Sequence, residues 1–196
     1  MDKCAKCRKF GAKLFLKGER CTSAKCSFTR RNYAPGSHGG KKKFSRKSEY
    51  GTQLLEKQKA KAEYGLRERQ FAKIFRLASR SKENTGEELL RALEMRLDSL
   101  VYRLGWAVSR KQARQFVGHR QFKINDKIVN IPSVVLKVKD KISPLKKEFT
   151  LKNKVTPPKW LKLDSKNALV EILRKPAREE IETDLDEQKI LEFYSR

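Results

Sequence analysis

The four cysteines are the residues whose type and spacing most directly indicate chemistry. All lie within the first 26 residues, as Cys4-x-x-Cys7 followed by Cys21-x-x-x-x-Cys26. Two close pairs can place four thiolates around one metal ion, with Zn–S bonds of about 2.3 Å, and can fold a segment too short for its own core. The spacing predicts a metal site at Cys4, Cys7, Cys21 and Cys26. It would be structural, because four thiolates leave no ligand position open.

The spacing constrains the ligands more than it constrains the metal. Zinc is the first expectation, and an iron–sulfur cluster is the alternative, because thiolate quartets hold both. Free thiols or two disulfides are the remaining interpretations. Disulfides are rare in a reducing cytosol, and the first residues, Met1–Cys4, do not begin an export signal.

The charge of the chain indicates a polyanionic partner. The 196 residues include 48 Lys and Arg against 23 Asp and Glu, a formal charge of +25. RNA or DNA fits best, because neutralising phosphates releases condensed counterions, and an anionic membrane surface is the weaker alternative. No stretch approaches the roughly 18 consecutive apolar residues of a membrane-spanning helix. We therefore expect a cytoplasmic protein that binds nucleic acid.

Residues 29–44 read as an extended basic arm in which cations and aromatic residues alternate with turn formers. Pro35 and Gly36 oppose helix formation. The cations could pair with phosphates, and the aromatic rings could stack on unpaired bases, although a solvated linker is the alternative. The candidate RNA-binding residues of the arm are Arg30, Arg31, Tyr33, His38, Lys41, Lys42 and Lys43.

The following segment, residues 45–79, has apolar residues at every third or fourth position. This period predicts helices, broken near Gly65, with Phe71, Ile74 and Phe75 in a core. Charged residues on the other helix faces are usually only solvated, yet some should meet RNA. The candidates are Lys57, Arg67, Arg69 and Arg76.

The central segment predicts two helices followed by a small sheet. Thr85-Gly86-Glu87-Glu88 reads as a capping box that opens a long helix with a leucine stripe ending at Gly105, and Ser109-Arg110-Lys111-Gln112 reads as a second box. Strands are expected at 122–124 and 127–129 around a two-residue turn, and at 134–138.

The start of the second central helix carries the clearest anion-binding pattern. Arg110, Lys111 and Arg114 point outward near a helix N-terminus, where backbone amides and guanidinium groups both favour phosphate. A lone His119 between helix and strand is more often structural than functional. Further candidates in this module are Arg96, Arg103, Ser109, His119 and Lys123.

The last part of the chain predicts a strand at 169–173 and an acidic, helical end within 181–194. Trp160 is expected to be a buried anchor rather than a stacking platform, because Leu161 and Leu163 flank it. The acidic residues between Glu179 and Glu187 should cap helices or pair with cations of the chain itself.

Two central runs, Glu94–Gly105 and Ser109–Gln115, are similar to the RNA-binding module named after ribosomal protein S4. Flanking residues extend the resemblance to the bacterial small-subunit ribosomal protein S4 family over nearly the whole chain. These are the cysteine segment and residues 33–39, 48–54, 85–87 and 192–196. The cysteines resemble the metal-binding branch of that family.

The resemblance implies an α+β, mostly helical fold with an inserted module. Its expected parts are a cysteine knuckle and basic arm at 1–44, a helical domain at 45–86 plus 164–196, and an S4-type RNA-binding domain at 87–163. Where the family commonly has glycine, this chain has Arg120 and Asp126, and it has Lys139-Asp140 in place of a Pro-Gly-Asp turn. Turn geometry there is expected to be strained or altered.

The resemblance also implies a function. A member of this family would bind small-subunit rRNA first, nucleate the subunit body at a junction in the 5′ domain, lie near the point where mRNA enters, and influence decoding accuracy. Its neighbours would be ribosomal proteins S5 and S3, and it could repress its own mRNA.

Three other functions compete with this one. An enzyme is disfavoured, because the chain has two histidines, no nucleophile with a base and no open metal position. A DNA-binding zinc protein would need a groove-reading element or a dimerisation seam, and neither is apparent. An RNA-binding assembly or stress factor with the same module would be absent from mature subunits.

Overall fold

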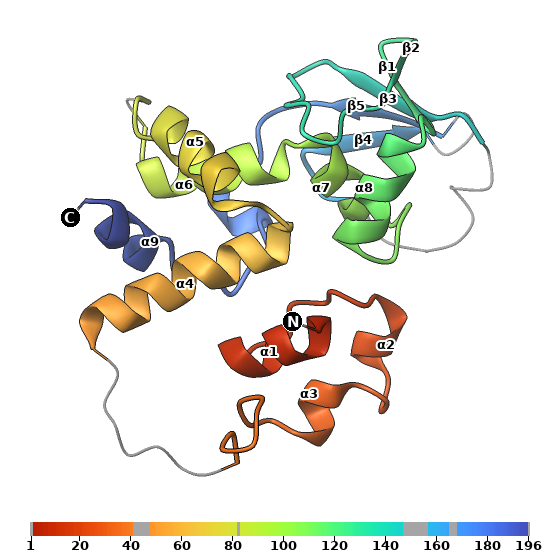
Figure 1. Ribbon diagram of the computed structural model, residues 1–196. Coiled ribbons are helices and arrows are strands. Elements are labelled where there is room, and N and C mark those ends of the chain that lie inside the picture. The colour runs from red at the N-terminus through yellow and green to blue at the C-terminus, as the bar shows by residue number, and fades with distance from the viewer. Residues whose placement is uncertain (1, 41–47, 82, 147–156, 165–167, 196) are drawn as a thin grey trace. The chain divides into compact units, whose positions relative to one another are not determined.

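The computed structural model describes residues 2–40, 48–81, 83–146, 157–164 and 168–195 (Figure 1). Contacts divide the chain into two compact units. The first comprises residues 1–72 and 184–196, and the second comprises residues 73–183. The predicted domain limits remain a prediction, since these units divide the chain at other positions. None of the described helices is long and apolar enough to span a membrane.

The N-terminal part of the first unit consists of three short helices around the cysteines. They are α1 (Lys3–Phe10), α2 (Glu19–Thr22) and α3 (Ser27–Arg30). The side chain of Asp2 accepts a hydrogen bond from the Cys4 amide and so caps α1 at its start. Packing of α1 against α3 then brings the two cysteine pairs together.

The rest of the first unit pairs a long helix with the C-terminal helix. α4 (Glu49–Tyr64) begins where the Ser48 hydroxyl accepts from the Gly51 amide and ends at Gly65, whose φ of 64° suits glycine. α9 (Glu187–Tyr194) begins at an Asp186 cap and packs on α4. The predicted break near Gly65 and the predicted helical end of the chain are confirmed.

Helix α5 (Glu68–Ala78) contributes to both units. Phe71 is fully buried and stacks on Tyr194, with ring centroids 6.4 Å apart. Ile74 and Phe75 are half-buried. The predicted core position is therefore confirmed in full at Phe71, whereas Ile74 and Phe75 are only partly buried.

The predicted long central helix is wrong in one respect, because it is two helices. α6 (Thr85–Glu94) is capped by Asn84, not Thr85, and α7 (Leu97–Arg103) begins after Arg96, which has an extended backbone. A hydrogen bond from the Leu136 amide to the Met95 carbonyl, and one from the Leu97 amide to the Val134 carbonyl, hold the break. Backbone groups of residues 134–136 therefore supply the hydrogen-bond partners that a continuous helix would have supplied.

The same bonds explain why the predicted strand at 134–138 is wrong. Its backbone forms only an isolated bridge, Arg96 with Val135, and Val135 and Val138 are exposed while Leu136 is buried. The third strand along the chain is instead β3 (Lys141–Pro144).

The second unit has an antiparallel five-stranded sheet in the order β2-β1-β3-β5-β4. Its other strands are β1 (Phe122–Ile124), β2 (Lys127–Val129), β4 (Leu161–Asp164) and β5 (Leu169–Ile172). The hairpin at 122–129 and the strand near 169–173 were both predicted. Since β5 pairs with β3, residues 169–172 belong to this sheet. A short 3-10 helix, η2 (Arg178–Glu180), follows.

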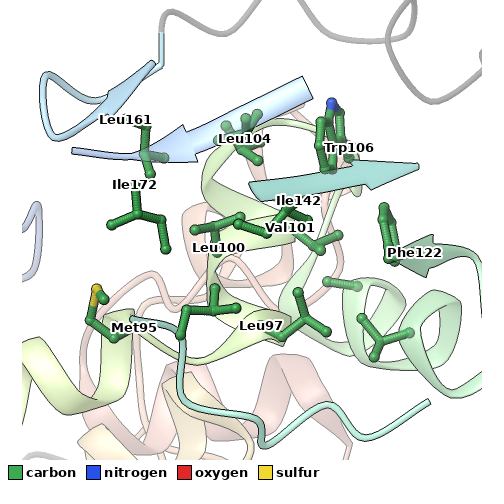
Figure 2. Close-up of a cluster of buried hydrophobic side chains, with 14 of the residues drawn as sticks. Met95, Leu97, Leu100, Val101, Leu104, Trp106, Phe122, Ile142, Leu161 and Ile172 are labelled. Atoms are coloured by element: carbon green, nitrogen blue, oxygen red, sulfur yellow. The ribbon is translucent and has the colours of Figure 1, made fainter. Parts of the chain in front are cut away.

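One apolar cluster joins the sheet to helices α7 and α8 (Arg110–Gly118) (Figure 2). Leu97, Leu100 and Val101 of α7 are fully buried against Ile142 of β3. Trp106 stacks on Phe122 with centroids 5.6 Å apart. Trp160 is also buried in this cluster, which confirms it as an anchor. Because Ala113 and Val117 of α8 belong to this cluster, the core fixes the position of α8 beside α7.

The turns in which the chain departs from the family's glycines carry side chains where glycine would be favoured. Arg120, Asn125, Asp126 and Lys139 have φ of 58°, 48°, 64° and 72°. Two adjacent positive φ values at Asn125-Asp126 fit the predicted two-residue hairpin turn. The strain expected at Arg120, Asp126 and Lys139 is therefore a positive φ at residues that have a side chain. The predicted hairpin nevertheless forms.

Candidate nucleic-acid interface

The start of α8 is built by its cap. Ser109 is buried, and its hydroxyl accepts from the Gln112 amide at 3.3 Å. The Gln112 side chain in turn accepts from the Val108 amide at 2.9 Å. Ser109 is thus the predicted cap, but the Gln112 side chain bonds to the Val108 amide and not to the Ser109 amide, so the predicted capping box forms only in part. The two bonds hold the first turn of a helix whose amide end favours anions. Lys111 is exposed on that turn.

Arg110 belongs to a group of cations around one buried carboxylate. Glu94, at the end of α6, is 1% exposed. Arg103 donates to both of its oxygens, at 2.9 and 3.0 Å, and Arg110 donates to Oε1 at 3.2 Å. The guanidinium of Arg110 also lies 4.7 Å from the centre of the Tyr102 ring. Arg103 and Arg110 are therefore held in place, with little of either side chain exposed.

A second buried carboxylate, that of Asp98, lies near the next arginine along α8, Arg114. Asp98 of α7 accepts from Arg96 at 3.0 and 2.8 Å and from the Ser99 amide at 3.0 Å. Arg114 lies 3.9 Å from the same carboxylate, and 38% of its side chain is exposed. Arg96 is 3% exposed, which leaves its guanidinium inside the module. Arg114 combines an anchor with access to solvent.

His119 and Lys123 follow α8. His119 is exposed, and its carbonyl accepts from the Gln121 side chain at 2.9 Å. Lys123 is half-buried on β1. Both positions are compatible with a surface that continues from the helix into the first strand.

The candidates of the helical region separate by burial. Arg67, Arg69 and Arg76 are exposed along α5 and the residue before it. Lys57 is 5% exposed; its ammonium donates to Glu68 at 2.9 Å and lies 4.0 Å from the centre of the Phe193 ring. Lys57 thus holds α9 against α4. Because its side chain is almost fully buried, it has little surface to offer RNA.

Glu68 is the acidic centre of that cluster. It accepts from Lys57, from Lys61 at 2.6 Å and from the Tyr194 hydroxyl at 3.1 Å. Burial raises the pKa of Glu68, but the hydrogen bonds from Lys61 and Lys57 outweigh it and place the pKa at about 2. Burial, followed by the charge of Glu68, raises the pKa of Tyr194 above its ordinary value.

The basic arm is described as far as residue 40. Arg30, Arg31 and His38 are exposed. Tyr33 is met by Arg8 of α1, whose guanidinium lies 4.8 Å from the ring centre and whose Nε donates to the Tyr33 carbonyl at 2.9 Å. The arm therefore begins from a fixed point on α1. The candidates Lys41, Lys42 and Lys43 lie outside the described residues.

The cysteines face one apolar cavity. All four line it, together with Phe15, Leu16 and Phe28. Cys7, Cys21 and Cys26 are buried, Cys4 is half-buried, and none is in a disulfide. Burial raises the pKa of Cys7, whereas a hydrogen bond from the Thr29 backbone lowers the pKa of Cys26. Four thiols are a suitable donor set for zinc.

The arrangement of these thiols is nevertheless not that of a finished metal site. In the part of the chain that the structure describes, no three His, Cys, Asp or Glu side chains are placed so that they could hold a metal ion. The amide of Lys17 donates to the Cys21 sulfur at 3.3 Å, a bond common around ligating thiolates. The cluster fits a metal by composition, and the thiolates would have to draw closer to bind it.

Sequence reasoning missed Arg8 and the two buried carboxylates, Glu94 and Asp98. A signal was present for the carboxylates. Glu94 and Asp98 are four residues apart, as are Arg110 and Arg114. Residues four apart share one face of a helix, so on the continuous helix that the sequence predicts the two carboxylates would lie on one face, as the two arginines do on theirs.

This geometry defines a class: a protein with a basic module of two helices and a small antiparallel sheet, preceded along the chain by a helical domain. Residues 1–94 match the model of the ribosomal protein S4/S9 N-terminal domain, and residues 95–142 match that of the S4 domain. The chain belongs to the ribosomal protein S4 family.

Relatives agree over the full length. The small ribosomal subunit protein uS4 of Heliobacterium modesticaldum is 52% identical over 204 residues, and that of Dictyoglomus thermophilum is 49% identical over 200 residues. Each alignment covers 98% of this chain and 96% of the relative. Family membership confirms a structural ribosomal role in the small subunit, and it confirms that the protein is not an enzyme.

Proposed function

We propose that this protein binds small-subunit rRNA through a surface that starts at the first turn of α8 and includes Arg110, Lys111, Arg114, His119 and Lys123. The observation that carries the proposal is the capped start of α8, where Lys111 is exposed beside an anchored Arg114. Backbone amides, a helix dipole and cations act there on the same phosphate.

Other exposed cations are proposed as further RNA contacts. They are Arg30, Arg31, Arg67 and Arg69 of the first unit and Arg76 of the second unit. These are treated as phosphate contacts that position the protein without reading bases. A formal charge of +25 supports a contact that covers many phosphates.

We further propose the roles that the family resemblance implies. The protein would bind the 5′ domain of the small-subunit rRNA early and nucleate assembly of the subunit body. It would lie near the point where mRNA enters, contact ribosomal proteins S5 and S3, and contribute to decoding accuracy. Repression of its own mRNA is part of the same proposal. The alternative, a free assembly or stress factor, predicts that the protein is absent from mature subunits on sucrose gradients.

The decisive experiment is a salt-titrated binding assay. The full-length protein is titrated against the small-subunit 5′ domain, large-subunit rRNA of equal length and duplex DNA. Preference for the 5′ domain that persists as salt rises supports the proposal, because non-specific phosphate contacts fade steeply with salt. Equal and equally salt-sensitive affinity for all three would refute it.

We also propose that Cys4, Cys7, Cys21 and Cys26 hold one structural zinc ion. The shared cavity, its burial and the nearby Lys3, Lys13 and Lys17 support this, because cations favour thiolates. Bound zinc would supply cross-links that fix α1, α2 and α3, which have little core of their own.

Metal analysis of the purified protein tests the zinc proposal. One zinc per chain is expected, lost in Cys26→Ser and kept in the control Lys25→Ser, which changes an exposed neighbour. Iron with acid-labile sulfide and visible absorption would instead support the cluster. Intact protein with neither metal would refute both.

A further inference from the structure

The two buried carboxylates of the second unit stand in a regular relation to the arginines of α8. Glu94 meets Arg110 at 3.2 Å, and four residues further along each segment Asp98 meets Arg114 at 3.9 Å. Both carboxylates are nearly inaccessible, with side chains 2% and 6% exposed. The pairs form one ladder between the α6–α7 segment and α8.

Each carboxylate already has a closer partner. Arg103 donates twice to Glu94, and Arg96 donates twice to Asp98. One carboxylate in each group thus faces two guanidinium groups, and in the Glu94 group Arg103 also lies 3.7 Å from the carboxylate of Glu182. A buried carboxylate can fix an arginine through some of its N–H groups, because a guanidinium has five donors and can still offer others to an anion.

Three contacts restrict Arg110 in particular. Its guanidinium is bonded to Glu94, stacked over the ring of Tyr102, and carried by the first residue of a helix whose cap is fixed by Ser109. An arginine normally loses much rotamer freedom when it grips a phosphate. An arginine already ordered by the protein loses less, so binding is tighter for the same contacts.

We propose that Glu94 and Asp98 are positioning residues for RNA recognition, and that they act through Arg110 and Arg114. This inference rests on the proposed function, since it assumes that the start of α8 meets RNA. Glu94 carries most of the effect, because its contact with Arg110 is the shorter one and the side chain of Arg110 is only 12% exposed.

Charge alone makes the opposite prediction, which gives a sharp test. Glu94→Gln removes one negative charge from a chain of formal charge +25 and would strengthen binding to RNA if only net charge mattered. Positioning predicts weaker binding instead, by about tenfold. The matched control is Glu179→Gln, the same change at an exposed residue of η2.

The experiment measures affinity of the full-length variants for the 5′ domain at several salt concentrations, with thermal melting to show that each is folded. Glu94→Asp keeps the charge and should restore part of the loss. In an Arg110→Ala background, Glu94→Gln should change affinity less than about twofold, because the residue through which it acts is gone.

The possible results distinguish a failure of the positioning role from a failure of the proposed RNA-binding function. Unchanged or tighter binding by Glu94→Gln, or a loss of the same size with and without Arg110, would overturn the positioning role. If Lys111→Ala and Arg114→Ala also left specific binding intact, the proposed function would fall as well. Should Glu94→Gln not fold, the same cycle is run with Glu94→Asp, which keeps the charge but shortens the side chain that reaches Arg110, with the same criteria.

Discussion

Arg96 and Asp98 form a two-bonded ion pair almost entirely removed from water. Nε and Nη2 of Arg96 donate to the two oxygens of Asp98 at 3.0 and 2.8 Å, and the side chains are 4% and 6% exposed. Arg96 is also the residue at which α6 and α7 separate. The pair therefore stabilises the break that sets the direction of α7.

Removing one partner of this pair should destabilise the protein strongly. Asp98→Ala leaves a buried guanidinium without its carboxylate, and we expect a loss of about 3–5 kcal/mol in the free energy of unfolding. Urea denaturation followed by circular dichroism measures it. Replacing both partners, Arg96→Met with Asp98→Ala, should cost less than Asp98→Ala alone. A single variant within about 0.5 kcal/mol of the parent would contradict the assignment.

The turn after α8 offers a substitution that should stabilise the protein. Arg120 has a φ of 58°, where a side chain is disfavoured by about 1 kcal/mol relative to glycine. Arg120→Gly should raise the free energy of unfolding by about 0.5–1 kcal/mol, since the Arg120 amide can still donate to the Val117 carbonyl. Arg120→Ala is the control, because it removes the charge and keeps the strained Cβ. Equal gains in both variants would show that charge, not conformation, is responsible.

The Glu68 cluster should make stability sensitive to acid. Its pKa is about 2 in the folded chain, below the ordinary 4.5. The group therefore stabilises the fold fully above about pH 4.5, and this stabilisation is lost as pH falls toward 2. Half of the side chain is exposed, so screening limits the contribution to about 1 kcal/mol.

The measurement is the difference in unfolding free energy between the parent and Glu68→Gln, taken near neutral pH and again near pH 3. The difference should shrink on acidification, because near pH 3 the unfolded parent binds a proton at Glu68 that the folded parent still lacks, whereas the variant binds none in either state. Tyr194→Phe removes one of the hydrogen bonds that lower the pKa of Glu68, so its effect should also shrink on acidification, by less than that of Glu68→Gln. A constant difference for Glu68→Gln would refute the ion-pair role.

Local chemistry explains which elements could be predicted from the sequence. Ser109 with Gln112 marks a helix start, Gly65 marks a helix end, and Asn125-Asp126 marks a hairpin, because each requirement acts within a few residues. The break at Met95–Arg96 had no local signal, since the leucine stripe continues across it. It depends on hydrogen bonds to residues 134–136, which only the folded chain brings near.

The same distinction applies to the candidate site. Exposed cations such as Lys111 could be proposed from their place on a helix start. Lys57 looked equivalent in the sequence, but Glu68 and the ring of Phe193 enclose it. Its burial depends on a residue from the far end of the chain, so no window around position 57 could reveal it.

The slope of RNA affinity with salt should distinguish the cations of α8 from those of the sheet edge. Each phosphate contact contributes about 0.7–0.9 to the slope of log affinity against log salt concentration. Lys111→Ala should reduce the slope by about one contact and weaken binding to the 5′ domain several-fold, since Lys111 is exposed beside the helix N-terminus.

Lys162→Ala is the matched control: it removes the same charge from an exposed position on the edge strand β4, where no helix start adds to its field. We expect little change in its slope or affinity. Equal losses in both variants would mean that RNA meets the module through diffuse charge. A loss only in Lys111→Ala would place phosphate at the start of α8, where amides and cations act together.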